Sequence, residues 1–408
     1  MKTFLVGGAV RDELLNFPVS ERDWVVLGET PQSMLEMGFM AVGKDFPVFL
    51  HPVTRDEYAL ARTERKIGPG YKGFCIHADP EVSLEEDLMR RDLTINAIAK
   101  SDTDEIIDPF GGRQDIERRI FRHISPAFCE DPVRILRIAR FAARYGHLGF
   151  KIADETLHLM QTMVKNGEVD HLVPDRVWAE LYKALCEKTP TLFFEVLKDC
   201  HALPILFPEL NALFGVPQPE HYHPEIDTGI HSLMCLEQAA RLTSKPEVRF
   251  AALMHDLGKG ITPKDKLPHH HGHENSGLPL LENLCSRLRV PNPFKHLAKH
   301  VMQYHTHCHR AFELRPSTLT DMLHKLGAFK NPAGLTDFLL ACEADAKGRT
   351  GLENRPYPQS AHVMMAAKVG AAVDISALLA EGLQGTQIGD AIRQLRIKAI
   401  SDACKRTS

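Results

Sequence analysis

The spacing of apolar residues changes partway along the chain, and this change divides it into two structural classes. Up to about residue 125, short apolar runs such as "FLVGG" and "DWVVLG" alternate with short helical segments, and "FPVFLHP" and "DEYALAR" are typical of a strand pair. From residue 130 onward the apolar residues recur at helical spacing, as in "DPVRILRIARFAARY" and "RVWAELYKALCE". The chain therefore predicts an α+β fold, with a small mixed sheet near the N-terminus and an all-α remainder.

Stretches rich in proline interrupt the helical part and predict breaks between its elements. The segment "FGVPQPEHYHPE" (214–225) has the composition of a linker, and further breaks are expected near 311–317 and 353–359. A length of 408 residues is enough for two to four domains. We expect a head over residues 1–140 and a helical neck and body over 141–220. A second functional domain is expected over 221–330, and a helical tail over 331–408.

Composition limits the class of protein to which the chain can belong. Hydrophobic residues make up 44% of the sequence, and no apolar run reaches the roughly 18 residues that span a bilayer. The nine dispersed cysteines include no C-x-x-C pair, which is typical of a reducing compartment. The apolar start of the chain is too short for a signal peptide. We therefore expect a cytoplasmic protein without membrane association.

Charge is distributed unevenly along the chain. The net charge of −4 argues weakly against nucleic acid as a partner. Between Arg113 and Arg144, however, eight arginines occur together with only four acidic residues. A basic stripe of this kind on an otherwise acidic protein can bind phosphate.

A glycine pair near the N-terminus predicts a phosphate site. Gly7 and Gly8 lie between an expected strand and an expected helix, where backbone N–H groups can turn toward an anion. Arg11 follows about one turn later and could add a charge-assisted hydrogen bond to phosphate. Glycines that serve only the geometry of the turn are the alternative interpretation.

A pair of acids indicates a metal site in the same region. Glu21 and Asp23 are two residues apart at the start of the apolar run "WVVL", so their side chains would point to the same side. Adjacent carboxylates repel one another unless a cation lies between them, and Mg²⁺ held together with substrate phosphates is a usual arrangement. The alternative is a solvated strand end that pairs with Arg22.

Two further motifs combine arginines with carboxylates. In "RRDLTINA", Arg91 could reach a triphosphate, and Asp92 or Asn96 a ribose hydroxyl. In "EDPVRILRIARFAARY", Asp131 and Arg134 are three residues apart and therefore neighbours on a helix, where they could read the edge of a base. The same helix carries an arginine stripe, for which a solvated face is the alternative. The stripe consists of Arg134, Arg137, Arg140 and Arg144.

Taken in order, these motifs resemble those of a known family. The segments "LVGGAVRDELL", "ERDWVVLG", "RRDLTINA", "DPFGG" and "EDPVRILRIARF" are similar to the motifs of the bacterial-type (class II) tRNA nucleotidyltransferases, the CCA-adding enzymes. The resemblance covers at least residues 1–145, and the helical remainder fits it. It implies that the head adds C, C and A to the 3′ end of tRNA from CTP and ATP, with Mg²⁺ and without a nucleic-acid template.

The resemblance also implies roles for individual residues. The catalytic, Mg²⁺-binding acids would be Glu21 and Asp23, although the family pattern is usually written Asp-x-Asp and this chain has a glutamate first. Nucleotide contacts would fall on Gly8, Arg11, Arg91, Arg137 and Arg140. Selection of CTP and then ATP would fall on Glu130, Asp131 and Arg134.

Histidines mark a second candidate site. Most of the 22 histidines lie between residues 221 and 309, where His255 and Asp256 end an apolar helix and His231 lies upstream. Mixed imidazole and carboxylate ligands suit a transition metal. Residues 225–330 resemble the HD superfamily of metal-dependent phosphohydrolases. This resemblance implies a phosphatase and cyclic phosphodiesterase that acts on nucleotide 2′- and 3′-phosphates with a metal such as Ni²⁺.

The expected metal ligands do not form a complete set in the sequence. By resemblance they are His231, His255 and Asp256, with His270, His271 or His273 nearby. The superfamily usually closes the site with a distant aspartate, but no aspartate lies between Asp265 and Asp321. The histidines of "QYHTHCH" occur in the region where it is expected. We therefore expect either that a histidine substitutes or that the site is incomplete.

Other functions remain open from the sequence. A poly(A) polymerase shares the head, although the expected basic extension is not seen, and an enzyme that adds only CC or only A is a further alternative. Of a different class, the chain could be a hydrolase whose head is only a tRNA-binding module. The basic segment "RQLRIKAISDACKR" could touch tRNA or form a solvated helix. The expected partners are tRNA, CTP and ATP, with no obligate protein partner evident.

Overall fold

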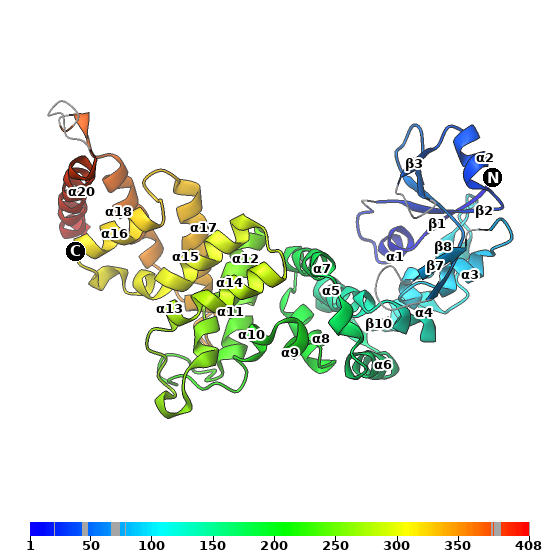
Figure 1. Ribbon diagram of the computed structural model, residues 1–408, viewed down its shortest axis with the longest axis horizontal. Coiled ribbons are helices and arrows are strands. Elements are labelled where there is room, and N and C mark those ends of the chain that lie inside the picture. The colour runs from blue at the N-terminus through cyan, green and yellow to red at the C-terminus, as the bar shows by residue number, and fades with distance from the viewer. Residues whose placement is uncertain are drawn as a thin grey trace. The chain divides into compact units, whose positions relative to one another are not determined.

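The computed structural model describes residues 1–19, 21–42, 48–66, 74–77, 79–376, 378 and 385–407, with side chains except at 64–66, 74–77 and 407. The chain forms two compact units (Figure 1). Unit 1 comprises Met1–Glu180 and Leu192–Ile205, and unit 2 comprises Leu181–Thr191 and Leu206–Ser408. The four-part division predicted from the sequence is finer than this, and its boundaries stay a prediction.

A seven-stranded mixed sheet lies at the centre of the head. Its strands, in the order in which they pair, are β3 (Met40–Val42), β4 (Val48–Leu50), β5 (Glu57–Leu60), β2 (Asp23–Leu27), β1 (Lys2–Val6), β8 (Ala99–Lys100) and β9 (Ile106–Ile107). Strands β1 and β2 are antiparallel, whereas β2 and β5 are parallel. The strand pair predicted from the sequence exists as the antiparallel pair β4–β5. The small mixed sheet is therefore confirmed.

Strand β2 has apolar residues on both of its faces. Val25 packs with Val6 in one buried cluster, and Val26 packs with Met34 in another. Successive side chains of a strand point to opposite faces, so the continuous run "WVVL" is explained by a sheet that is covered on both sides. The strand end that carries Asp23 is consequently held in place by core packing on either side.

Short helices surround the sheet, and local sequence explains where some of them begin. Thr30 and Ser83 cap the helices that follow them, each through a reciprocal pair of hydrogen bonds with the residue three positions later. The head also contains a two-stranded antiparallel pair formed by β6 (Thr63–Lys66) and β7 (Phe74–His77). Its helices are α1 (Gly8–Leu14), α2 (Pro31–Glu36), α3 (Leu84–Met89), the 3-10 helix η1 (Thr94–Asn96) and α4 (Gly112–Arg118).

The rest of unit 1 is helical, apart from a short parallel pair of strands, β10 (Ile120–Phe121) and β11 (Lys151–Ile152). Helix α5 (Val133–Tyr145) is almost wholly buried, including Arg134 and Arg140. The alternative of a solvated arginine face is therefore wrong for these two residues. The other helices that lie wholly in unit 1 are η2 (Pro126–Glu130), η3 (Gly146–Leu148), α6 (Asp154–Lys165) and η4 (Glu168–His171). Residues of both units form α7 (Pro174–Cys186), α8 (Thr191–Asp199) and α9 (Leu203–Leu206).

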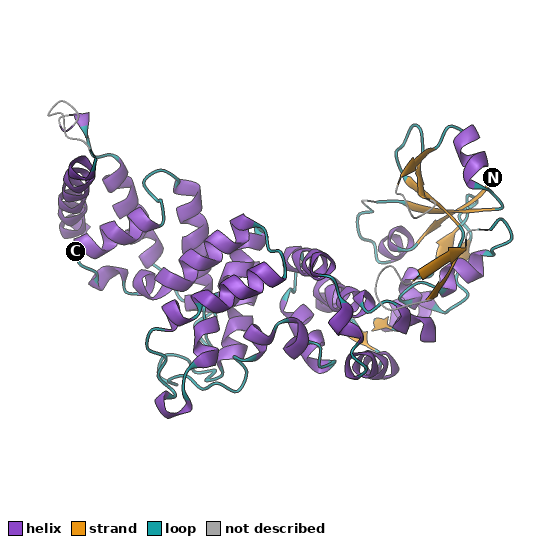
Figure 2. Cartoon of the chain, viewed as in Figure 1, coloured by secondary structure: helices purple, strands orange, loops and turns teal. Residues whose placement is uncertain are grey.

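Unit 2 is built from helices throughout the part that is described (Figure 2). They are α10 (Pro208–Asn211), α11 (Thr228–Leu242), α12 (Pro246–Met254), η5 (Leu257–Ile261), η6 (Lys264–Lys266), α13 (His273–Ser276), α14 (Leu278–Arg287), α15 (Asn292–His309), η7 (Ala311–Glu313), α16 (Pro316–Lys325), α17 (Pro332–Lys347), α18 (Gln359–Ala371) and α20 (Thr386–Thr407). Helices α11, α12, α15 and α17 pack against one another, and α16, α18 and α20 form a second group. The predicted all-α remainder is confirmed.

The segment 214–225 is not the linker that its composition predicts. Gln218 and His223 are buried, and Pro217 forms a backbone bridge with Asp227 at the start of α11. Proline and histidine here make a compact turn that packs against the helices of unit 2. Among the described residues, no helix is both long and apolar enough to cross a membrane.

Candidate functional site

The glycine pair in the head adopts the predicted turn between strand and helix. Strand β1 ends at Val6, Gly7 has a φ of 70°, and α1 begins at Gly8. A Cβ atom at Gly7 would lie 2.9 Å from Nη1 of Arg91. The positive φ favours glycine at position 7, and the absence of a side chain also lets this guanidinium approach closely.

The two predicted metal-binding acids lie at the edge of the sheet, beside this turn. Asp23 begins β2 and pairs in register with Val6, and Glu21 precedes the strand; both are exposed. The protein packed around Asp23 raises the pKa of its carboxyl group; Arg91 opposes this rise, and Glu21 adds to it. Asp23 is thus electrostatically coupled both to Glu21 and to Arg91, and two carboxylates that repel one another can share a cation.

Arg91 is oriented by a carboxylate that sequence analysis missed. Its Nη2 atom donates to Oδ2 of Asp87 over 3.2 Å, and Arg90 donates to Oδ1 of the same residue over 2.8 Å. Burial alone would raise the pKa of Asp87, but the two arginines outweigh it and the pKa is lowered. Asp87 lies in the last turn of α3, and Arg91 follows four residues later, just after the helix ends; this spacing was the available signal.

A chain of hydrogen bonds connects four other predicted residues. Nη1 of Arg11 donates to Oδ1 of Asn96 over 2.5 Å, and Nδ2 of Asn96 donates to Oδ1 of Asp92 over 2.8 Å. Nε of Arg137 donates to Oδ2 of Asp92 over 2.7 Å. Asp92 and Asn96, which were candidates for binding ribose, therefore fix the positions of Arg11 and Arg137.

Arg140 is held by a residue far from it in sequence. Its Nε atom donates to Oε2 of Glu180 over 2.6 Å, and its guanidinium lies 4.4 Å from the ring centre of Phe141. Glu180 is buried on α7. Sequence analysis gave no indication of this pair, because nothing in the local sequence shows that α7 packs against α5.

Two of the predicted base-selecting residues, Asp131 and Arg134, form side-chain hydrogen bonds to residues outside the predicted set. Asp131 accepts two hydrogen bonds from Arg176, over 3.1 Å and 2.7 Å. Arg134 donates to the backbone carbonyl oxygens of Ala127 and Arg90. Glu130 ends η2 and is half-buried. Arg176 was missed by sequence analysis, although it now belongs to the same cluster.

The second candidate site lies in unit 2 and is formed by residues from three helical segments. His231 comes from α11, and His255 and Asp256 follow α12, as the sequence predicted. The fourth residue is Asp345 on α17, whose Oδ1 atom lies 3.2 Å from Nε2 of His231 and whose Oδ2 atom lies 3.6 Å from Nε2 of His255. The expectation that a histidine substitutes, or that the site is incomplete, is therefore wrong. The distant aspartate is present, but outside the region in which it was sought.

Several atoms in this cluster have no hydrogen-bond partner although they are buried. Among the described residues these are Nε2 of His255, both carboxylate oxygens of Asp256 and Oδ1 of Asp345. Lys259 and His273 contact the oxygens of Asp256 at 2.6 Å and 3.2 Å, and His231 lies 3.2 Å from Oδ1 of Asp345, so ion contacts rather than well-aligned hydrogen bonds surround these oxygens. Buried carboxylates and imidazoles this close together are the donor types of a metal site. Burial would raise the pKa of Asp256, but His255 and Lys259 outweigh it and the pKa lies well below its usual range. The donor set therefore fits a cation.

A thiol is also close to this cluster. Sγ of Cys235 lies 3.5 Å from Nε2 of His231. Burial, reinforced by Asp345, raises the pKa of this thiol well above its usual range. A metal requires the thiolate form, so the oxygen and imidazole donors are the better ligand set.

The neighbouring histidines differ in their positions. Nε2 of His273 lies 3.2 Å from Oδ1 of Asp256. In His270, by contrast, Nδ1 contacts the hydroxyl of Thr262 and Nε2 contacts the backbone carbonyl of Pro217. His271 is exposed. Of the three histidines that were expected nearby, only His273 is recorded in contact with the cluster. Two further histidines contact the aspartates: His305 faces Asp256, and His309 faces Asp345.

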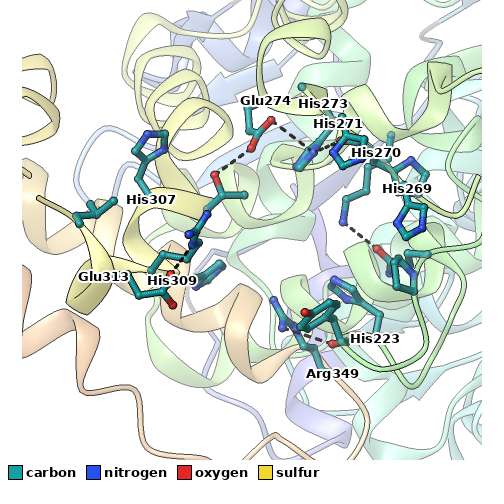
Figure 3. Close-up of a pocket in the computed structure, with 18 residues that line it drawn as sticks. His223, His269, His270, His271, His273, Glu274, His307, His309, Glu313 and Arg349 are labelled. Atoms are coloured by element: carbon teal, nitrogen blue, oxygen red, sulfur yellow. Dashed lines mark hydrogen bonds and ion pairs between the residues drawn. The ribbon is translucent and has the colours of Figure 1, made fainter. Parts of the chain in front are cut away.

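A cavity of about 930 Å³ opens beside the cluster. Figure 3 shows His269 to His273 on one side of it, His307, His309 and Glu313 on another, and Arg349 beside His223 on a third. Lys259 also lines it. The cavity therefore brings imidazole and cationic groups together next to buried carboxylates.

Three family models match successive parts of the chain. The family model of the poly A polymerase head domain matches residues 3–122, and that of the probable RNA and SrmB-binding site of polymerase A matches residues 149–214. The model of the HD domain matches residues 228–367. This match includes Asp345 and extends beyond residue 330, where the sequence analysis ended the domain.

Full-length relatives decide the family. The multifunctional CCA protein of Teredinibacter turnerae is 61% identical over 400 residues, which cover 98% of this chain and 97% of the relative. That of Thioalkalivibrio sulfidiphilus is 60% identical over 400 residues, covering 98% of each chain. The chain belongs to the multifunctional CCA protein family.

The fold agrees with this assignment. The apo form II of a CCA-adding enzyme superposes with a TM-score of 0.69 at 20% identity, over 98% of this chain and 88% of that structure. At this identity the comparison supports the fold alone. A member of the multifunctional CCA protein family combines nucleotidyltransferase and HD domains, and both kinds of domain imply the use of divalent metal ions.

Proposed function

We propose that this chain adds C, C and A to the 3′ end of tRNA from CTP and ATP, without a nucleic-acid template. The observation that carries the proposal is that Asp23, with Glu21 two residues before it, pairs in register with Val6 next to the Gly7–Gly8 turn, where the guanidinium of Arg91 approaches Gly7 and is held by Asp87. Family membership at about 60% identity over the full length supports it. The reaction is in-line attack of the tRNA 3′-hydroxyl on the α-phosphate, with pyrophosphate as the leaving group.

The acids and the arginines of the head have different roles in this reaction. Glu21 and Asp23 would hold Mg²⁺, which when bound neutralises triphosphate charge and lowers the pKa of the attacking hydroxyl. The backbone at Gly8 and the cationic side chains bind the triphosphate, because fixed donors need no reorganisation as charge develops. These side chains are Arg11, Arg91, Arg137 and Arg140.

The third group of head residues selects the nucleotide. Glu130, Asp131 and Arg134 lie at the start of α5, where Arg134 is fixed by two carbonyl oxygens and Asp131 by Arg176. A hydrogen-bond acceptor and a hydrogen-bond donor that are both held in fixed positions can distinguish the edges of cytosine and adenine. We assign to these residues the choice of CTP and then ATP.

The test is to incubate tRNA that lacks CCA with Mg²⁺ and labelled CTP and ATP, and to sequence the 3′ end. We expect full CCA. Addition of A alone in long runs would indicate a poly(A) polymerase, and addition that stops at CC, or that starts only on a CC end, would indicate a partial enzyme. Absence of any incorporation, with tRNA still bound, would leave the head as a binding module.

We also propose that unit 2 hydrolyses phosphate esters, with nucleotide 2′- and 3′-phosphates and 2′,3′-cyclic phosphodiesters as substrates. The specific observation in its favour is the pair of buried carboxylates, Asp256 and Asp345, whose oxygens lie within 3.1 to 3.8 Å of Nε2 of His231 and His255. His231, His255, Asp256 and Asp345 would hold a transition metal such as Ni²⁺, which when bound supplies a hydroxide nucleophile at neutral pH. Lys259, bound to Asp256 over 2.6 Å, keeps that carboxylate ionised.

Hydrolysis of 2′,3′-cyclic AMP by purified protein, with Ni²⁺, Co²⁺ or Mn²⁺ added, tests this second activity. We expect turnover with at least one of these metals and loss of turnover in Asp345→Asn. Asp265→Asn serves as the matched control, because Asp265 is exposed and outside the cluster. Turnover that is equal in wild type and Asp345→Asn would contradict the ligand assignment.

A further inference from the structure

Arg349 occupies a distinct position in the wall of the cavity in unit 2. It lines the cavity and is 19% exposed, and its Nη2 atom lies 3.6 Å from Oδ1 of Asp345. A group bound at the buried carboxylates would therefore lie within the reach of this guanidinium. Figure 3 shows Arg349 beside His223 on this side of the cavity.

The backbone next to Arg349 is fixed by close packing. A Cβ atom at Gly348 would lie 2.6 Å from Sγ and 2.7 Å from the backbone nitrogen of Cys235, so only glycine fits there. The carbonyl oxygen of Gly348 lies 3.0 Å from Nδ1 of His231. Arg349 is therefore attached to a backbone segment that also contacts the candidate metal ligand His231, and its position is coupled to that of the cluster.

The hydrogen-bond donors of Arg349 are incompletely used. Its Nε atom is buried and has no hydrogen-bond partner among the described residues, and its Nη1 atom reaches the backbone carbonyl of Tyr222 only at 3.4 Å. A guanidinium carries five N–H donors in a planar arrangement. A desolvated donor without an acceptor is unfavourable, and an anion in the cavity would remove this cost.

The other cations of the cavity are engaged differently. Lys259 is buried between Oδ2 of Asp256, at 2.6 Å, and Oε1 of Gln218, at 2.8 Å. Arg310 is 71% exposed and pairs with Glu313 over 2.8 Å. Of these three cations, Arg349 combines a position next to the cluster with a buried donor that has no partner.

We propose that Arg349 binds the phosphoryl group of the substrate, through paired N–H donors, while the group lies against the metal cluster. This inference rests on the proposed hydrolase function and specifies its substrate subsite: a phosphate monoester or cyclic phosphodiester presents two oxygens to one guanidinium. Planar, paired donors match phosphate better than a point charge does. Arg349 is thus a substrate-binding residue rather than a metal ligand.

Binding of inorganic phosphate to the metal-loaded full chain tests the proposal, measured by isothermal titration calorimetry. We expect Arg349→Gln to weaken phosphate binding roughly 10- to 100-fold. Arg349→Lys should recover part of the loss, because it restores the charge without the paired donors. Arg310→Gln is the matched control, since it removes an exposed arginine from the same cavity, and it should change the affinity by less than about twofold.

A second measurement separates recognition of phosphate from a structural role. Ni²⁺ affinity should stay the same or rise in Arg349→Gln, because the removed charge faces Asp345. The proposal would be overturned if Arg349→Gln loses Ni²⁺ binding, or if its phosphate affinity equals that of the wild type. It would also be overturned if Arg310→Gln and Arg349→Gln lose phosphate affinity equally, or if the wild type binds no phosphate. Phosphate binding that depends on Arg349, without turnover of 2′,3′-cyclic AMP, would retain this subsite and refute the hydrolase function.

Discussion

Oε1 of Glu225 lies 3.0 Å from Nδ1 of His231, the candidate metal ligand on α11. The same oxygen lies 3.0 Å from Nδ1 of His223, which lines the cavity. A hydrogen on Nδ1 of His231 leaves the lone pair of Nε2 directed toward Asp345 and Asp256. Glu225 therefore selects the ring form that a metal requires.

We expect Glu225→Gln to weaken Ni²⁺ binding by about 10- to 100-fold, because the carboxylate that orients His231 is lost. Calorimetric titration of Ni²⁺ into the apo protein measures this directly. Glu220→Gln is the control, since Glu220 is exposed in the same segment. Equal affinity in Glu225→Gln and wild type would show that the carbonyl of Gly348 alone is sufficient to orient the ring.

The acid pair of the head gives a graded prediction. Asp23→Ala should abolish nucleotide incorporation and leave tRNA binding largely intact, because the cation site is lost and the basic residues are retained. Glu21→Asp should keep activity, whereas Glu21→Gln should lose most of it. Incorporation and gel-shift assays measure the two properties separately. A fully active Gln variant would show that position 21 is only a solvated strand end.

Selection between CTP and ATP should depend on the pairing of Asp131 and Arg176. Arg176→Ala removes both hydrogen bonds to Asp131 and frees its carboxylate. We expect it to reduce discrimination among nucleotides more than it lowers triphosphate affinity, as we also expect for Asp131→Ala and Arg134→Ala. Misincorporation ratios measured with single nucleotides test this.

The control for this prediction is Arg118→Ala, which removes an exposed arginine of the head. Its discrimination should match that of the wild type. If Arg176→Ala discriminates as well as Arg118→Ala does, the ion pair with Asp131 serves only to join the helices.

The Asp92–Arg137 pair predicts a pH-dependent contribution to stability. Burial would raise the pKa of Asp92, but Arg137 and Asn96 outweigh it, and the pKa lies below its ordinary value of 3.8. A carboxyl group whose pKa is lower in the folded than in the unfolded state stabilises the fold at pH values above its ordinary pKa. This stabilisation is lost as the pH falls from the ordinary pKa toward the folded-state pKa. In Asp92→Asn an amide N–H would face the donor of Arg137.

We therefore expect Asp92→Asn to lower the free energy of unfolding by roughly 2 kcal/mol at pH 7. The difference from the wild type should shrink progressively below about pH 4. Denaturant titrations of both proteins between pH 3 and pH 7 measure it. A difference that does not change with pH would contradict the ionic origin of the effect.

Local sequence was enough to predict the classes of structure, and it indicated candidate site residues. The run "WVVL", the glycine pair and the helical periodicity after residue 130 depend on near neighbours, and each became the element that was predicted. His255 and Asp256 were found for the same reason, because they are adjacent at the end of one apolar helix. The order of the motifs indicated the family before any tertiary contact was known.

Only the tertiary structure identified the residues that complete these sites. Asp345 lies 114 positions after His231 in the sequence (345 minus 231). Arg176 and Glu180 come from a helix outside the head motifs. Segment 214–225 has the composition of a linker, yet it places Glu225 against His231. Periodicity specifies which face of a helix is buried, but it does not specify which other helix packs against that face. The partners of the sites were therefore decided by packing between elements distant in sequence.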